Sequence, residues 1–326
     1  MKAAVNTTYG PPQVVQIEEI ETPIPGNTEV LIRVHATTVN RTDCGLRDPR
    51  PFFVRAFSGL RRPKNPVLGS EFAGDVAALG SGVTQFTEGD RVFGLSGSKF
   101  GAHAEYLSFR ETGPLATAPA NTTYEEAASI CDGATLALNI LRAGDVDTGR
   151  KKLLIYGASG AIGTAAVQLA KYFGADVTAV CSSRHVELVK SLGADHVIDY
   201  TQEDFTKNGQ TYEVIFDAVG KASFSYSRNS LTPRGIYLSS DFGTLYQNPI
   251  FALLTYVTSK FAGRRAKLPL PSYNQDTIVF LKELVEAGEL TPVIDRTYPL
   301  EDIVDAYEYV EEKRKTGNVV ITVASD

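Results

Sequence analysis

Three glycines spaced three residues apart, Gly157, Gly160 and Gly163, lie between the apolar run 153–156 and the Ala-rich segment 164–171. The run predicts a buried parallel strand and the segment a helix packed on it. A glycine turn leading into a helix presents free backbone N–H groups and the positive end of the helix dipole, which suits a pyrophosphate. The turn therefore predicts a dinucleotide and redox chemistry. The residues expected to bind it are Gly157, Ser159, Gly160, Ala161, Ile162 and Gly163.

A second group of residues bears on the ribose of that dinucleotide. Turns that select NAD place an acidic residue roughly 20 residues beyond the first glycine. Here the strand predicted over 176–180 leads into Cys181–His185, which contains no carboxylate. Ser182 and Ser183 can donate hydrogen bonds, and Arg184 can hold a 2′-phosphate with its planar guanidinium. The sequence favours NADPH, the alternative for Arg184 being a solvated charge at a helix start.

The elements that must position these residues follow two patterns. Up to residue 123, short β-branched runs broken by Gly and Pro predict a β-rich domain or barrel without regular helices. From Tyr124 a helix over 125–143 and then alternating strands and helices predict a doubly wound parallel sheet. Two helices and a strand over 318–323 follow and are expected to rejoin the first domain. The expected domains are 1–123, continued by 268–326, with 124–267 inserted.

Composition limits the classes of partner and the compartment. With 43% hydrophobic and 21% charged residues, the 326-residue chain fits a soluble globular protein. A net charge of −6 argues against nucleic acid as the main partner. Residues 1–6 contain no apolar signal core, and the widely spaced Cys44, Cys131 and Cys181 suit a reducing compartment. We therefore expect a cytoplasmic protein.

Two segments test the expectation of solubility. The apolar segment 250–262 is shorter than the ~20 residues that a membrane-spanning helix needs. The basic segment 47–64 contains Phe52, Phe53 and Phe57. We interpret them as a core or interface helix and a loop lining a pocket. The alternative is a peripheral membrane patch that meets lipid-soluble substrates.

Several short motifs occur along the chain in an order and spacing that are specific only when taken together. They are Asn40–Asp43, Leu68–Gly74, Glu88–Gly94, Gly101–Tyr106, Gly157–Gly163, Leu192–Asp195 and Gly317–Ile321. On these motifs the chain resembles the zinc-independent quinone oxidoreductase branch of the medium-chain dehydrogenase/reductase superfamily, over nearly its whole length. The resemblance implies a GroES-like catalytic domain with an inserted Rossmann domain, and a homodimer.

The resemblance also bears on metal. Zinc-bearing relatives carry their ligands at the positions of Asn40, Ser70 and Cys131, so one ligand type of three remains here. Zinc needs several Cys or His ligands, and the resemblance therefore implies a metal-free site. Without a Lewis acid, nothing lowers the pKa of a simple alcohol for its oxidation, whereas quinones and α,β-unsaturated carbonyls already accept hydride readily.

Further site residues are implied by their places in the family's motifs. The expected catalytic residues are Asn40, as a hydrogen-bond donor, Ser70, as a donor to the developing oxyanion, and Thr135. Asp43 and Glu71 are expected to pair with an arginine in a structural role. No general acid is evident, so we expect water to deliver the proton. The remaining residues expected at the coenzyme, besides Asn40 and Thr135, are Tyr200, Val219, Gly220 and Asn318.

The function that these expectations favour is NADPH-dependent, metal-free hydride transfer to a small quinone or α,β-unsaturated carbonyl. One enzymatic alternative is reduction of an enoyl thioester or another activated alkene. A non-enzymatic alternative is an NADPH-binding, crystallin-like or membrane-associated protein.

Overall fold

The computed structural model describes all residues except 50–54, 241–252, 254–262, 270 and 324–326. Phe52, Phe53 and most of the apolar segment 250–262 therefore lie outside the described residues. Contacts divide the chain into two units. The first comprises Met1–Asp132, Tyr273–Gly288 and Pro292–Asp326, and the second Gly133–Ser272 and Glu289–Thr291. No helix among the described residues is long and apolar enough to cross a membrane.

The first unit is built around one long strand, β3 (Glu29–Val39). Along one edge it pairs with β4, and along the other its two halves pair with β6 and β15. Val30, Ile32 and Val34 are fully buried, because alternate residues of a strand face the same side of the sheet. The seven-stranded sheet has the order β14-β15-β3-β4-β5-β7, with β6 beside β3. The other strands are β4 (Glu71–Leu79), β5 (Arg91–Leu95), β6 (Tyr106–Arg110), β7 (Leu115–Thr117), β14 (Ile294–Pro299) and β15 (Asn318–Thr322), beside a separate pair, β1 (Lys2–Val5) and β2 (Gln16–Glu19).

The expectation that the first 123 residues lack regular helices is wrong. Helix α1 (Arg41–Arg47) begins at Asn40, whose side chain accepts from the N–H groups of Thr42 and Asp43. Asp43 in turn accepts from the N–H of Asn40, which completes a capping box. The other helices of this unit are α2 (Arg55–Ser58), α3 (Tyr124–Ala128), α9 (Gln275–Glu286) and α10 (Ile303–Glu311).

The single helix predicted over 125–143 is two helices, α3 and α4 (Cys131–Ala143). The Ser129 hydroxyl bonds the Glu126 carbonyl, and the Asp132 N–H donates to the Glu71 side chain. Because that N–H donates to a side chain of β4, it does not continue the backbone hydrogen bonds of α3. α3 packs against β3 and β4, so the first unit extends to Asp132, beyond the predicted boundary at 123.

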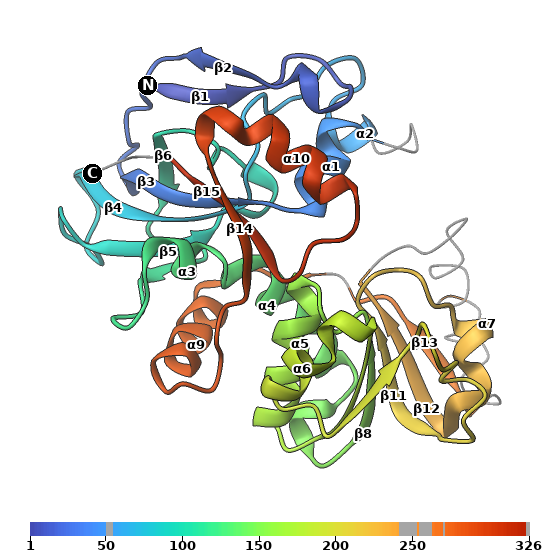
Figure 1. Ribbon diagram of the computed structural model, residues 1–326. Helices are drawn as coiled ribbons and strands as arrows, with labels where there is room; N and C mark the ends of the chain where they lie inside the picture. The colour runs from blue at the N-terminus through green and yellow to red at the C-terminus, as the bar shows by residue number, and fades with distance from the viewer. Residues whose placement is uncertain (50–54, 241–252, 254–262, 270, 324–326) are drawn as a thin grey trace. The chain divides into compact units, whose positions relative to one another are not determined.

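The second unit confirms the predicted doubly wound parallel sheet. Its six strands have the order β10-β9-β8-β11-β12-β13, and all their pairings are parallel. Helices α5 (Ala161–Tyr172) and α6 (Val186–Ser191) cover one face, and α7 (Phe224–Ser227) lies on the other (Figure 1). The strands are β8 (Lys152–Tyr156), β9 (Asp176–Cys181), β10 (His196–Asp199), β11 (Tyr212–Asp217), β12 (Leu231–Ser239) and β13 (Arg265–Lys267).

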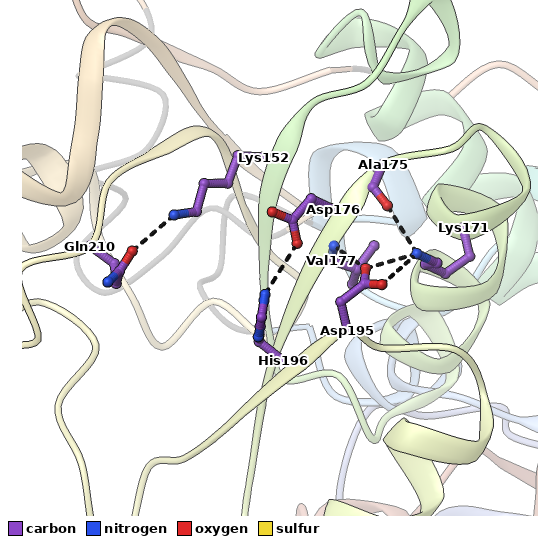
Figure 2. A network of polar contacts seen from close by, with 8 residues as sticks. All are labelled: Lys152, Lys171, Ala175, Asp176, Val177, Asp195, His196 and Gln210. Atoms are coloured by element: carbon purple, nitrogen blue, oxygen red, sulfur yellow. Dashed lines mark hydrogen bonds and ion pairs between the residues drawn. The ribbon is translucent and has the colours of Figure 1, made fainter.

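Polar contacts tie together the edge of this sheet at which the strands begin (Figure 2). The Lys171 Nζ lies 2.8 Å from both carboxylate oxygens of Asp195, which also accepts from the Val177 N–H at 2.8 Å. His196 lies 3.5 Å from Asp176. The opposite edge, where parallel strands end, is the one at which such sheets bind ligands.

Candidate functional site

The glycine turn between β8 and α5 requires glycine at two of its three positions. Gly157 has a φ of +85°, and a Cβ there would lie 2.5 Å from Val219 Cγ1. A Cβ on Gly163 would lie 2.2 Å from the carbonyl oxygen of Gly157, so this residue permits the close packing of helix on strand. Gly160 has a φ of −81° and no such crowding. The sterics therefore account for the first and third glycines.

The N-terminus of α5 offers hydrogen-bond donors to an anion. Gly160 is its N-cap, and no side chain of the described residues caps the helix. The first turn contains no acidic residue. The first N–H groups of a helix have no partner within it, and within the described chain those of Ser159, Ala161, Ile162 and Gly163 have no acceptor. These are residues that the sequence assigns to the coenzyme, and they fit its pyrophosphate.

The segment after β9 carries the residues predicted to select the coenzyme. Arg184 is exposed, and among the described residues its guanidinium has no ion-pair partner. Ser183 is already engaged, because its hydroxyl donates to Asp199 Oδ2 at 2.5 Å. This hydrogen bond lowers the pKa of Asp199. Tyr200 is 53% exposed. Asp199, at the end of β10, is an acidic neighbour of Ser183 that the local sequence of the turn did not reveal.

The loop after β11 is fixed by Asp217, a buried carboxylate. It accepts hydrogen bonds from the N–H groups of Val219 at 3.1 Å and Ala222 at 2.9 Å, and from the Tyr237 hydroxyl at 3.0 Å. Burial raises the pKa of Asp217 to about 6. Gly220, with a φ of +66°, lies in this loop. Asp217 therefore sets the path of the two residues, Val219 and Gly220, predicted at the nicotinamide.

In the first unit, Asn40 uses every polar group of its side chain within the protein. Its Oδ1 caps α1, and its Nδ2 donates to Ser70 Oγ at 2.8 Å and to Asp132 Oδ2 at 3.2 Å. The amide therefore orients other side chains, and a bond to substrate would have to replace one of these. Ser70, 3% exposed, accepts from Asn40, and its own hydroxyl hydrogen has no acceptor among the described residues.

Two buried carboxyl groups surround this pair. Asp43 accepts from the N–H groups of Asn40 at 3.0 Å and Gly69 at 3.1 Å, and burial raises its pKa to about 7. Glu71 accepts from the Thr38 hydroxyl and from the Asp132 N–H at 2.7 Å. Burial and the charge of Asp132 raise the pKa of Glu71 to about 8. Within the described chain neither group pairs with an arginine, so that expectation is wrong.

Two further charged residues join this group, which we call the Asp132 cluster: Asn40, Asp43, Ser70, Glu71, Asp132 and Lys315. Burial raises the pKa of Asp132 to about 7 and lowers that of Lys315 to about 8. The Lys315 Nζ donates to the carbonyl oxygen of Gly317 at 2.5 Å. Neither residue was singled out from the sequence, since neither belongs to a motif of the resemblance. The two residues lie near each other because strand pairing brings distant segments of the chain together.

Two other predicted coenzyme residues are buried. Thr135 is fully buried, and its hydroxyl has no hydrogen-bond partner among the residues that the structure describes. Asn318, 6% exposed, donates from Nδ2 to the carbonyl oxygens of Ser129 at 3.1 Å and Val293 at 3.2 Å. Asn318 therefore anchors the start of β15, and its assignment to the coenzyme stays a prediction.

The described residues include no group of three His, Cys, Asp or Glu side chains that could hold a metal ion. At the three positions of the zinc ligands, Asn40 bonds Ser70, and Cys131 is buried with the pKa of its thiol raised well above the usual value by burial.

Comparison with known proteins relates both units to redox enzymes. The model of the alcohol dehydrogenase GroES-like domain matches residues 26–120, and a zinc-binding dehydrogenase model matches residues 192–321. Two curated relatives, each 32% identical over 98% of this chain and 79% of the relative, are a 2-methylene-furan-3-one reductase of Solanum lycopersicum and an NADPH-dependent alkenal/one oxidoreductase, chloroplastic, of Arabidopsis thaliana. The structure of the quinone oxidoreductase from Coxiella burnetii, 28% identical, superposes with a TM-score of 0.87 over 99% of each chain.

Proposed function

The chain belongs to the quinone oxidoreductase branch of the medium-chain dehydrogenase/reductase superfamily, and we propose that it reduces a quinone or an α,β-unsaturated carbonyl with NADPH. The observation that carries this proposal is the α5 N-terminus, whose free N–H groups suit a pyrophosphate. NADPH, when bound, supplies the hydride. The relative named for NADPH-dependent alkenal/one oxidoreduction and the quinone oxidoreductase of similar structure support the acceptor class.

Different residues would hold different parts of the NADPH molecule. Ser159, Ala161, Ile162 and Gly163 would donate their backbone N–H groups to the pyrophosphate. Arg184 would bind the 2′-phosphate, because an exposed guanidinium that has no ion-pair partner in the described part of the chain can form a charge-assisted pair. Asp217 would keep the loop at 219–220 in its path beside the nicotinamide.

We further propose that the acceptor is activated without metal. Ser70 would donate its free hydroxyl hydrogen to the developing oxyanion, while Asn40 holds that hydroxyl in place. Quinones and enones need no stronger electrophile, since they accept hydride readily. Elemental analysis of chelator-washed, active protein tests this, and stoichiometric zinc would overturn it.

NADPH consumption with a panel of quinones, enones and enoyl thioesters tests the proposed reaction. We expect turnover with quinones or enones. Turnover confined to enoyl thioesters would move the acceptor to that class, and tight NADPH binding without any turnover would favour a non-enzymatic role.

Location and assembly are proposals of the same kind. We propose a cytoplasmic homodimer that does not bind membranes. The Arabidopsis thaliana relative is named as chloroplastic. Light scattering of purified protein and flotation with anionic liposomes at low salt test these points. A monomer, or protein floating with the liposomes, would contradict them.

A further inference from the structure

We propose that Asp132 is the acid that delivers the proton to the reduced acceptor. This inference rests on the proposed function, in which the hydride alone leaves the acceptor with a negative charge. From the sequence alone, we expect water to supply this proton. The structure places a carboxyl group beside the two residues, Asn40 and Ser70, that stand at the former ligand positions.

The geometry holds one oxygen of Asp132 and leaves the other free. Asn40 Nδ2 donates to Asp132 Oδ2 at 3.2 Å, and the same amide donates to Ser70 Oγ at 2.8 Å. Among the described residues Asp132 Oδ1 has no hydrogen-bond partner, and the side chain is half-buried, so it retains access to solvent or to a ligand. One amide therefore positions both the oxyanion donor and the proton donor.

One buried hydroxyl group, that of Ser70, indicates that a ligand oxygen belongs here. Ser70 has a hydroxyl hydrogen for which the described residues provide no acceptor, although the residue is almost fully buried. Buried polar groups without partners are rare in folded proteins. The carbonyl oxygen of an acceptor would satisfy the Ser70 hydroxyl.

The charges around Asp132 favour retention of a proton near neutral pH. Glu71 and Asp43 face it from β4 and α1, Lys315 from the segment before β15, and Tyr273 from the segment before α9. Three carboxyl groups beside one ammonium group cannot all ionise cheaply in a buried site. Burial accordingly raises the pKa of Asp132 to about 7. A carboxylic acid with this pKa can donate a proton at pH 7 and regain it from water.

With an enone as the acceptor, proton transfer from Asp132 completes the reduction. The hydride bonds to the β-carbon, the electrons of the C=C bond move toward the carbonyl, and an enolate forms. Ser70 donates a hydrogen bond to the enolate oxygen. Asp132 transfers its proton to the α-carbon, giving the saturated ketone and a carboxylate that water reprotonates. For a quinone, the proton goes to the oxygen and the product is the hydroquinone.

The variant Asp132→Asn tests the proposal, with Asp75→Asn as its matched control. Asp75 is also a half-exposed carboxylate of the first unit, but it bonds His35 and the Tyr124 hydroxyl, away from the cluster. We expect kcat with the best acceptor to fall about 10²- to 10⁴-fold in Asp132→Asn. In the wild type and in Asp75→Asn, kcat falls as pH rises above about 7, because the acid ionises. That alkaline limb is expected to disappear in Asp132→Asn.

A second measurement needs no turnover. Infrared difference spectra of the coenzyme-free protein between pH 6 and pH 8.5 should show the carbonyl band of a protonated carboxyl, and Asp132→Asn should lose part of it. Circular dichroism and NADPH titration establish that the variant folds. Unchanged kcat with an intact alkaline limb, or an unchanged band, would overturn the proposal. A wild type that reduces no acceptor would instead refute the proposed function, and the infrared result would still decide whether Asp132 is protonated.

Discussion

At the scale of single residues, Arg184 carries the choice of coenzyme. Replacing it in Arg184→Ala should raise KM for NADPH about 10- to 100-fold, since a charge-assisted hydrogen bond contributes about 1.5–3 kcal/mol. KM for NADH should change little, because NADH has no 2′-phosphate. Steady-state kinetics with both coenzymes measures this. Lys207→Ala is the control, because Lys207 pairs with Asp204 in the loop after β10. Equal losses with both coenzymes would show that Arg184 acts through structure alone.

The residue scale also shows where sequence reasoning stops. The glycine turn could be predicted because its requirements are local: a φ of +85° at Gly157 and a helix start within a few residues. The role of Asn40 could not, since its amide bonds Asp132, 92 positions away in the chain. Asp199 was missed for the same reason, because it reaches Ser183 only through the pairing of β10 with β9.

At the scale of elements, the loop after β11 depends on Asp217. In Asp217→Asn an amide nitrogen would face either the Val219 N–H or the Ala222 N–H and the Tyr237 hydroxyl, leaving a buried donor unpaired. We expect a loss of about 1–3 kcal/mol of stability and a several-fold higher KM for NADPH. Denaturant unfolding and kinetics measure the two effects. The control is Asp176→Asn at the opposite edge of the sheet, which should change neither; equal effects of both variants would contradict a specific role for the loop (Figure 2).

Elements were predictable where burial is uniform and were missed where side chains from afar decide. β8 was identified because Leu153, Leu154 and Ile155 are all fully buried, as in a sheet covered on both faces. The break between α3 and α4 could not be predicted, because the Asp132 N–H donates its hydrogen bond to the side chain of Glu71 in β4. The local sequence pattern alone predicts one continuous helix over 125–143.

At the scale of the whole molecule, the change from β-rich to alternating pattern reveals an inserted parallel sheet. What the pattern does not reveal is the exact division, because α3 packs on β3 and β4 and Glu289–Thr291 joins the second unit. In particular, Gln168 bonds Thr291 in both directions, at 3.0 Å and 2.8 Å. Boundaries therefore follow long-range pairing, which a single sequence does not record.

The carboxyl groups of Asp43, Glu71 and Asp132 should make the stability of the chain depend on pH. Asp43 and Asp132 have native pKa values of about 7 and Glu71 of about 8, against 3.8 and 4.5 in the unfolded state. Between pH 6.5 and 8 the native state therefore binds more protons than the unfolded state, so the free energy of unfolding falls as pH rises. The expected fall is on the order of 2 kcal/mol across this interval.

The interval is chosen so that other groups do not mask this slope. Below it, buried His103, with a native pKa of about 4 against 6.5 unfolded, makes stability rise with pH. Near its upper end and above it, Lys315, with a native pKa of about 8 against 10.5, acts in the same direction as His103, but inside the interval its effect is smaller than that of the three carboxyl groups. Urea unfolding at several pH values inside the interval measures the slope, which should become shallower in Asp132→Asn and stay unchanged in Asp75→Asn. Stability that rises between pH 6.5 and 8 would mean that the cluster is already ionised in the native protein, and that its proton is not held for catalysis.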